Sequence, residues 1–411
     1  MTARAPATGS GSRLAAAATL AWIAFALYML FPMVLPLSGV GLLYQTYLDG
    51  PLYWPLPPAG IAAVSLAAIA LIALVVGRGD FRRPLPAGLA ALALLNVALA
   101  QSLAGLVMAG LWALGYLALA IDEPGRKVLL PTFIALLVLQ CAVGLGAYAV
   151  GWEQYTTSGF GPRASSVYGS PNLLYPLVLL GLIAFLALGM RLTGRGRLWA
   201  FGVAALCGLC LVLTFSRAGW LGAAAGLVIL APSAPPRLRW VLIVLAIGWV
   251  VGAAVARTGG EITSPTNDKP TAARLTAWQL GWDAFLRSPV VGGGFDAYGR
   301  HLQDIGNPRR TCGPPPDPKN VVLSLAIDNG LVGLGLLGGS LAAALGIARR
   351  RRDDPALFFG DRYAAFLLPA VLASLFAAGL VDTTFLGGLD RSAATVAFLI
   401  LLGLAAPTEA P

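Results

Sequence analysis

The chain has 411 residues, of which 58% are hydrophobic and only 11% are charged, and its formal net charge is +10. A soluble globular domain carries about 25% charged residues, so this composition excludes an ordinary soluble fold. Apolar runs of about 20 residues recur along the chain, and each is long enough to cross a bilayer core as a helix. Because these runs are continuous and do not alternate, they also exclude a transmembrane barrel.

The apolar runs predict an all-α, polytopic membrane protein with about twelve transmembrane helices. The first run follows Arg4 and Arg13, but it is too long for a cleavable signal peptide and has no clear processing site. In chain order, the expected spans are 14–35, 58–77, 84–101, 103–121, 128–150, 172–190, 198–214, 218–231, 240–256, 320–347, 363–380 and 392–406.

The connections between the runs predict an orientation. With both termini in the cytoplasm, the inner segments contain 17 of the 28 basic residues and 7 of the 18 acidic ones, while the outer segments are neutral. An excess of Lys and Arg in short loops marks the cytoplasmic side of a membrane protein. The net positive charge is therefore a topology signal, and no basic and aromatic module indicates binding to nucleic acid.

The predicted organisation has three parts: N-terminal helices over 1–150, a core over 151–345 and C-terminal helices over 346–411. The core contains one large outer, periplasmic loop, 257–319. Within this loop, "TAARLTAWQLGWDAFLRSP" predicts a helix that lies on the membrane surface, with Arg274, Trp278, Trp282 and Phe285 on one face. The "GGG" after it predicts a turn, and "HLQDIGNPRRTCGPPPDPKN" is typical of irregular loop.

Arg217 stands in a short outer turn, "TFSRAG", between two apolar runs. An isolated arginine there would be an interfacial residue that snorkels toward water. The planar guanidinium also binds phosphate in a bidentate way, so several arginines on one face indicate a site for a lipid-linked phosphate or pyrophosphate. The outer side carries others of this kind, namely Arg163, Arg274, Arg287, Arg300, Arg309, Arg310 and Arg391.

Four segments resemble the O-antigen ligase family, which includes lipopolysaccharide O-antigen ligases, O-antigen and exopolysaccharide polymerases and some protein-glycosylating transferases. They occur in the family's order between about 150 and 345, and are "RASSVYGSPNLLYPLVLL", "LTFSRAGWLG", "RLTAWQLGWDAFLRSPVVGGGF" and "DPKNVVLSLAIDNGLVG". The resemblance implies a metal-independent glycosyltransferase in a bacterial inner membrane, without a cofactor. It would transfer a glycan from undecaprenyl pyrophosphate to an acceptor lipid, glycan or protein at the periplasmic face.

The resemblance also implies roles for single residues. Arg163, Arg217 and Arg274 match the arginines that hold the pyrophosphate and stabilise the charge on it as it leaves. Fixed cationic donors aimed at a developing negative charge usually contribute more to catalysis than any other single effect. The polar and aromatic residues of the same motifs are expected to support the site, and are Asn172, Ser216, Trp278, Asn320 and Asp328.

The chain departs from the family at one position. The family commonly has a histidine before the asparagine of the last motif, proposed as general base, where this chain has Lys319-Asn320. Three alternatives stay open at this point. In the first, His301, the only histidine, acts as the base, because its ordinary pKa suits the task. In the second, a loop carboxylate serves as the base, such as Asp296, Asp304 or Asp317; in the third, Lys319 is a further phosphate clamp and the chain has no dedicated base. The plain alternative for His301 is a solvated loop residue.

Other functional classes are less consistent with the sequence. A transporter would carry ionisable residues along its spans and similarity between its halves, whereas ionisable residues are nearly absent from the predicted spans and no convincing similarity between the halves is found. A non-catalytic family member would explain the missing histidine. Cys207 and Cys210 in "CGLC", like Cys141, lie in apolar runs without further ligands and are expected to be buried thiols.

Overall fold

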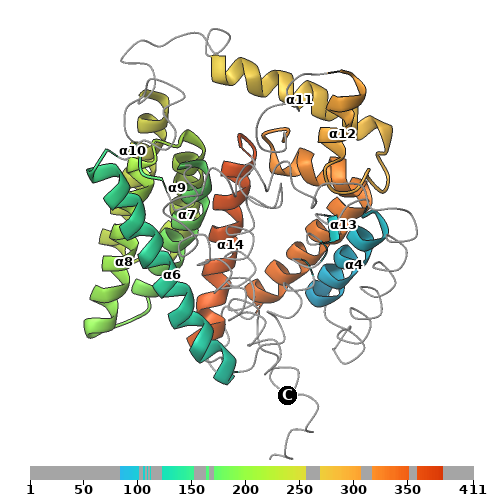
Figure 1. Cartoon of the computed structure of the whole chain (residues 1–411). Coiled ribbons are helices and arrows are strands. Elements are labelled where there is room, and N and C mark those ends of the chain that lie inside the picture. Colours follow the sequence, from blue (N-terminus) through green and yellow to red (C-terminus); the bar gives the residue numbers. More distant parts are fainter. Residues whose placement is uncertain are drawn as a thin grey trace, which may run out of the picture.

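The structure is a computed structural model that describes residues 84–100, 105–106, 109, 112, 123–151, 163–165, 171–255, 269–306, 317–350 and 359–382. This part of the chain is helical and contains no strand, in agreement with the predicted all-α class (Figure 1). The spans expected at 14–35, 58–77 and 392–406 lie outside the described residues, as does nearly all of 103–121.

The helices form where the apolar runs predict them. Their bounds are α4 Pro84–Ala98, α6 Glu123–Ala149, α7 Pro171–Gly189, α8 Gly194–Leu213, α9 Arg217–Leu230, α10 Pro236–Val255, α11 Lys269–Arg287, α12 Ala297–Asp304, α13 Val321–Arg350 and α14 Phe359–Gly379, with the short 3-10 helix η2 Ala231–Ser233 between α9 and α10. Two helical stretches, Gly194–Leu213 and Val321–Ala343, are long and apolar enough to cross a bilayer. The total of about twelve spans stays a prediction.

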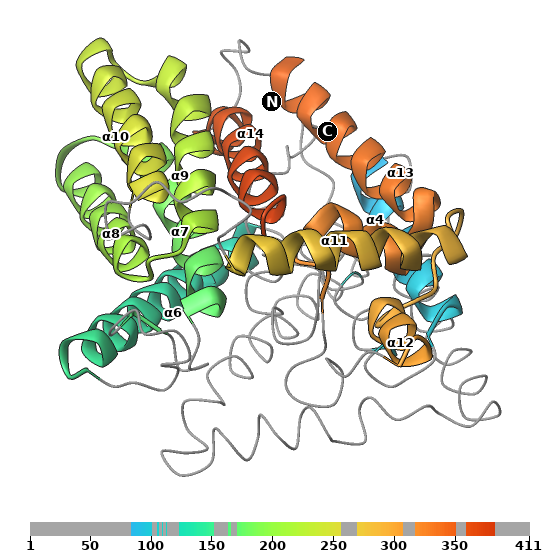
Figure 2. The ribbon, with the colours of Figure 1, turned by 90° about the horizontal axis from the view of Figure 1, so that it is seen from above.

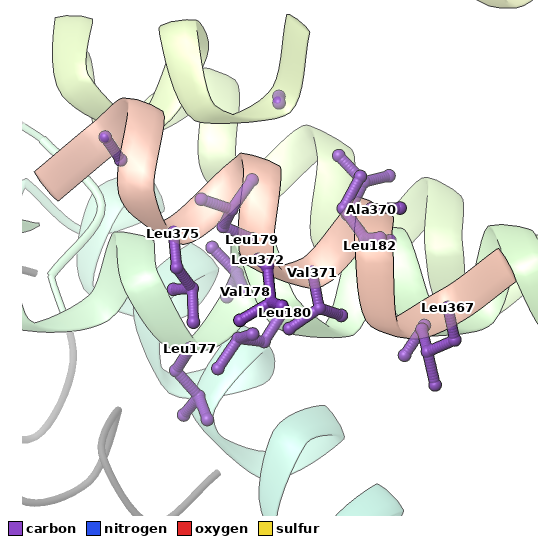
Figure 3. Packing of buried hydrophobic residues seen from close by; sticks show 14 of the residues in the cluster. Leu177, Val178, Leu179, Leu180, Leu182, Leu367, Ala370, Val371, Leu372 and Leu375 are labelled. Atoms are coloured by element: carbon purple, nitrogen blue, oxygen red, sulfur yellow. The ribbon is translucent and has the colours of Figure 1, made fainter. Parts of the chain in front are cut away.

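The helices pack in two groups. One contains α6, α7, α8, α9, α10 and α14, and the other contains α4, α11, α12 and α13 (Figure 1). In the first group, leucines of α7 interdigitate with those of α14, and Leu179, Leu180, Leu367 and Leu375 are fully or almost fully buried (Figure 3). The thiols of Cys141, Cys207 and Cys210 are buried and free, as predicted.

Small residues allow α9 to approach α14 closely. A Cβ atom added at Gly222 would lie 2.6 Å from the backbone oxygen of Ser374, and 3.0 Å from the Cβ of Ala378. Gly226, one turn later, also faces Ser374. This Gly-xxx-Gly spacing is the usual device by which membrane helices bring their backbones into contact.

The second group is organised around a break in α13. Gly330 adopts φ 63° and ψ −167°, a conformation essentially reserved for glycine. The segment after α11 docks into this break: Leu331 N donates to Pro289 O at 2.9 Å, and Gly294 N donates to Asp328 O at 2.9 Å. The "GGG" segment is thus a turn, as predicted. Together with Pro289, it forms hydrogen bonds to α13 on both sides of the kink.

The outer loop is more regular than the sequence suggested. The helix predicted after the polar stretch is present as α11, and it lies across one end of the molecule (Figures 1 and 2). The irregular loop expected from His301 onward was wrong for its first residues, because α12 continues to Asp304. Its short amphipathic repeat packs against α11 and α13, and this tertiary contact stabilises a helix too short to form alone.

The face predicted for α11 is only partly correct. Trp278 is half-buried and Phe285 is buried, whereas Trp282 is 55% exposed and lies at the edge of the packed face. The rings of Trp282 and Phe285 remain in contact, with centroids 5.3 Å apart. The helix packs on α13 and α12, while Leu275, Trp282 and Leu286 remain exposed.

Candidate functional site

One end of the molecule gathers most of the residues singled out by the sequence. The chain reverses direction at each turn, so α7, α9 and α13 begin at this end, and α8 and α14 finish there. The helix α11 lies across this end and packs on α13 and α12 (Figures 1 and 2). This end corresponds to the outer face of the predicted topology.

The turn between α8 and α9 carries Arg217 as the first residue of α9. The hydroxyl of Ser216 caps this helix by accepting from Gly219 N at 3.3 Å. Phe215 takes a left-handed conformation, with φ 50°, and the hydroxyl of Thr214 donates to Leu211 O at 2.7 Å. The turn is therefore stabilised by hydrogen bonds among its own polar groups.

Arg163 meets the same turn from a distant part of the chain. Its Nε donates to the backbone oxygen of Thr214 at 2.8 Å, and the N–H of Ala164 donates to Leu213 O at 2.8 Å. Arg163 and Arg217 are both half-buried. Two of the three arginines that were predicted to bind phosphate therefore lie at the same turn.

The third arginine, Arg274, lies in the first half of α11. It is half-buried, and its Nε is buried without a hydrogen-bond partner among the described residues. One turn later, Trp278 Nε1 donates to the backbone oxygen of Lys319 at 3.3 Å. This bond connects α11 to the segment that leads into α13.

Lys319 itself is held by an acidic neighbour. Its Nζ lies 2.8 Å from Asp317 Oδ2, its backbone N–H donates to Asp317 Oδ1 at 2.7 Å, and its φ is 55°. An ammonium group that donates to a carboxylate acts as a cation and a donor. This arrangement fits a phosphate clamp better than a general base, and it engages Asp317, another of the proposed bases.

Asn320 has a structural role that the sequence did not specify. Its Oδ1 accepts from the backbone N–H groups of Val322 and Leu323, both at 3.0 Å, and so caps the start of α13. Its Nδ2 donates to Leu380 O at 3.1 Å, just beyond the end of α14. One side chain therefore joins the two helix groups at the candidate site.

Asp328 and Asn172 lie in different surroundings. The carboxylate of Asp328 accepts from the backbone N–H of Ala297, and Arg300 Nη1 donates to Phe295 O at 2.7 Å beside it. Asp328 therefore supports the docked loop, away from the turn of Arg217. Asn172 is the second residue of α7 and is exposed at the same end as that turn.

The sequence did not predict one contact between two residues at this end of the molecule. Tyr175 of α7 is fully buried, and its hydroxyl lies 3.4 Å from Oδ2 of Asp382, which is also buried and directly follows α14. The spacing of 207 residues between them offers no local signal.

The structure does not bring His301 to the arginine turn. His301 is 6% exposed and belongs to α12, which packs on α11 and α13, so the solvated-loop interpretation is wrong. Its Nδ1 is buried without a hydrogen-bond partner in the described part of the chain. Burial, followed by the positive charge of Arg287, lowers the pKa of His301 below its usual value, against the opposing influence of Asp283 and Asp304.

Comparison with curated proteins finds no match. Residues 202–338 match the family model described as O-antigen ligase. The matched segment runs from α8 into α13 and contains the turn of Arg217, the loop helix with Arg274, and Lys319-Asn320. Members of that family are membrane-integral and act as glycosyltransferases in polysaccharide biosynthesis. This match supports an O-antigen ligase family assignment for the segment that it covers.

Proposed function

We propose that this protein transfers a glycan from undecaprenyl pyrophosphate to an acceptor hydroxyl or amide at the periplasmic face of a bacterial inner membrane. The family assignment supports the class of reaction and the use of a lipid-linked glycan. The single observation that carries the proposal is the bond from Arg163 to Thr214 O, because it attaches Arg163 to the turn that ends at Arg217.

The arginine turn supplies the chemistry that the leaving group requires. As the acceptor attacks the anomeric carbon, the bond from that carbon to the phosphate oxygen breaks and its electron pair stays on the pyrophosphate. Preorganised cationic donors stabilise this developing charge most effectively where water is partly excluded. Arg163 and Arg217 are both half-buried and meet that condition, and Arg274 and Lys319 would complete the clamp from the side of α11.

The proton of the acceptor needs a separate group. Asp382 is buried at the end of α14, beside the α13 cap formed by Asn320, whereas His301 lies beneath α11 and α12. A carboxylate near the acceptor can take the proton as the new bond forms. We therefore rank Asp382 before His301 as the base, with Tyr175 as the residue that positions its carboxylate.

The test uses the surface polysaccharide of the source cell with the gene deleted and then restored. Deletion should leave long glycan on the carrier lipid and remove it from the acceptor, as analysed by gel. Restored Arg217→Ala and Asp382→Asn copies should fail, while His301→Gln should succeed. Membrane levels and detergent-extracted size profiles of each variant must equal those of the wild type.

Three outcomes change the proposal. Acceptors that carry single repeat units after deletion would identify a polymerase of the same family. An unchanged ladder after deletion would exclude a required transfer step. Transfer at the wild-type rate by a folded Arg217→Ala protein would remove the arginine turn from the mechanism, and loss of transfer in His301→Gln alone would return the role of base to His301.

A further inference from the structure

A second cationic surface lies at the end of the molecule opposite Arg217. Both α8 and α10 begin there, and α8 alone spans about 30 Å at the usual rise per residue (Figure 1). Four arginines occupy the first turns of these two helices, and all four are exposed. We call this set the basic face; it consists of Arg195, Arg197, Arg237 and Arg239.

No acidic residue of this part of the chain neutralises the basic face. The sequence contains no Asp or Glu between Glu153 and Glu261, an interval that includes all of α7 to α10. The contacts of the four arginines leave their charge uncompensated: the guanidinium of Arg197 lies 5.5 Å from the ring centroid of Phe201, and Arg239 Nη2 donates to Pro232 O at 3.4 Å. The four charges therefore act together on whatever approaches this end.

Tryptophan side chains stand directly beside the basic face. Trp199 is 47% exposed and follows Arg197 by two residues, and Trp240 is 67% exposed and follows Arg239. Farther along α10, the exposed side chains become purely apolar, and include Val241, Val244 and Ile247. A basic end, then tryptophan, then an exposed aliphatic surface is the order in which headgroups, interface and acyl chains follow one another in a bilayer.

We propose that the basic face binds the phosphate headgroups of anionic phospholipids on the membrane surface opposite the candidate transfer site. Charge complementarity selects the ligand, because guanidinium groups bind phosphate oxygens in pairs and the helices from α7 to α10 contain no carboxylate that could compete for them. Trp199 and Trp240 set the depth at which the headgroups meet the helices. The lipid acyl chains then cover the aliphatic side of α10. This surface is separate from the proposed reaction and would persist in an inactive protein.

The test measures lipid retention by the purified full-length protein in detergent, using native mass spectrometry. Phosphatidylglycerol and phosphatidylcholine are supplied separately, so that they compare an anionic with a zwitterionic headgroup. The wild type should bind phosphatidylglycerol at least tenfold more tightly than phosphatidylcholine. Replacing the four arginines together by Gln should remove that preference, since each basic residue at an anionic surface contributes about a fivefold change in affinity.

Two matched controls separate charge from fold. The fourfold Arg→Lys variant keeps the positive charge, so it should retain most of the preference for phosphatidylglycerol. It should lose only the contribution of the paired hydrogen bonds that a guanidinium group makes to phosphate. Arg287→Gln removes one exposed arginine from the other end of the molecule and should leave the preference unchanged. Glycan transfer is not the readout, so failure of the proposed reaction does not affect this result.

Several results would overturn the proposal. One is equal retention of both lipids by the wild-type protein. This result would overturn the proposal even if the Gln variant fails to fold. Another is a folded Gln variant that keeps the full preference for phosphatidylglycerol. Displacement of the lipid by millimolar inorganic phosphate would show a simple anion site in place of a lipid surface.

Discussion

Arg163 donates from Nε to the backbone oxygen of Thr214 at 2.8 Å, although the two residues are 51 positions apart. This bond uses one edge of the guanidinium to attach the segment of Arg163 to the turn between α8 and α9. It also makes the position of Arg163 depend on the same turn that positions Arg217. The two arginines are therefore expected to act as one unit, and their effects on transfer should not add.

The first prediction concerns this unit. Arg163→Gln and Arg217→Gln should each reduce glycan transfer by about 100-fold, because each removes a fixed cationic donor from the developing phosphate charge. The double variant should show much less than the product of the two losses, since either loss disrupts the same clamp. The measurement is transfer from a purified lipid-linked glycan in vesicles. Additive losses would show that the two arginines work at separate places.

A second prediction follows from the ion pair at Lys319. Lys319→Met should weaken transfer by about tenfold through the Michaelis constant for the donor, because a cationic contact to the phosphate is lost. Lys319→Arg keeps the charge and should retain most of the activity. If Lys319→Arg were as impaired as Lys319→Met, and the pH profile of transfer shifted in both, Lys319 would be a base and not a clamp.

The cap at the start of α13 gives a third prediction. Asn320→Ala should lower the free energy of unfolding by about 1 kcal/mol, because two backbone N–H groups lose their acceptor. Asn320→Asp keeps the cap but cannot donate to Leu380 O, so it isolates the link between the helix groups. Thermal unfolding in detergent distinguishes the two, and equal stability of Asn320→Ala and wild type would contradict the assigned role.

A fourth prediction tests the break in α13. Gly330→Ala should lower the free energy of unfolding by about 3 kcal/mol, because φ 63° with ψ −167° excludes other residues. The new Cβ would also clash with the backbone oxygen of Val290. Gly335→Ala, one turn and a half later, meets nothing within 4 Å and serves as the matched control. Equal melting temperatures for the two variants would show that the docked loop does not hold the kink.

A fifth prediction concerns pH. Burial and Arg287 lower the pKa of His301, so the unfolded chain takes up a proton there more readily than the folded protein. This contribution to stability is present above the ordinary histidine pKa of about 6.5 and is lost as the pH falls below it. The wild type should therefore lose more stability than His301→Gln as the pH falls from about 8 to about 5, as measured by thermal unfolding. The same loss in both would place the pH dependence on groups other than His301.

Much of the local structure was accessible from the sequence. The apolar runs predicted α4, the helices from α6 to α10, α13 and α14 within a few residues, because continuous hydrophobicity over such lengths is itself the signal for a membrane helix. The Ser-Arg turn and the helix of the outer loop were also predicted. The O-antigen ligase match over 202–338 confirms the resemblance drawn from the short motifs.

The arrangement of the site was decided by tertiary structure alone. Arg163 meets Thr214, Tyr175 meets Asp382, and Asn320 meets Leu380 through pairs of residues far apart in the chain. In two of these three contacts the acceptor is a backbone oxygen. Because every residue has one, no residue pattern can predict these contacts. His301 shows the same limit: a lone histidine in a polar loop is typical of a solvated residue, and only the packing of α12 on α11 and α13 buries it. The sequence by itself determined the apolar helices, the helix of the outer loop and the charged residues at their ends, because these depend on local composition, whereas α12 needed its tertiary contacts. Which of those charges share one site depended on how the helices pack.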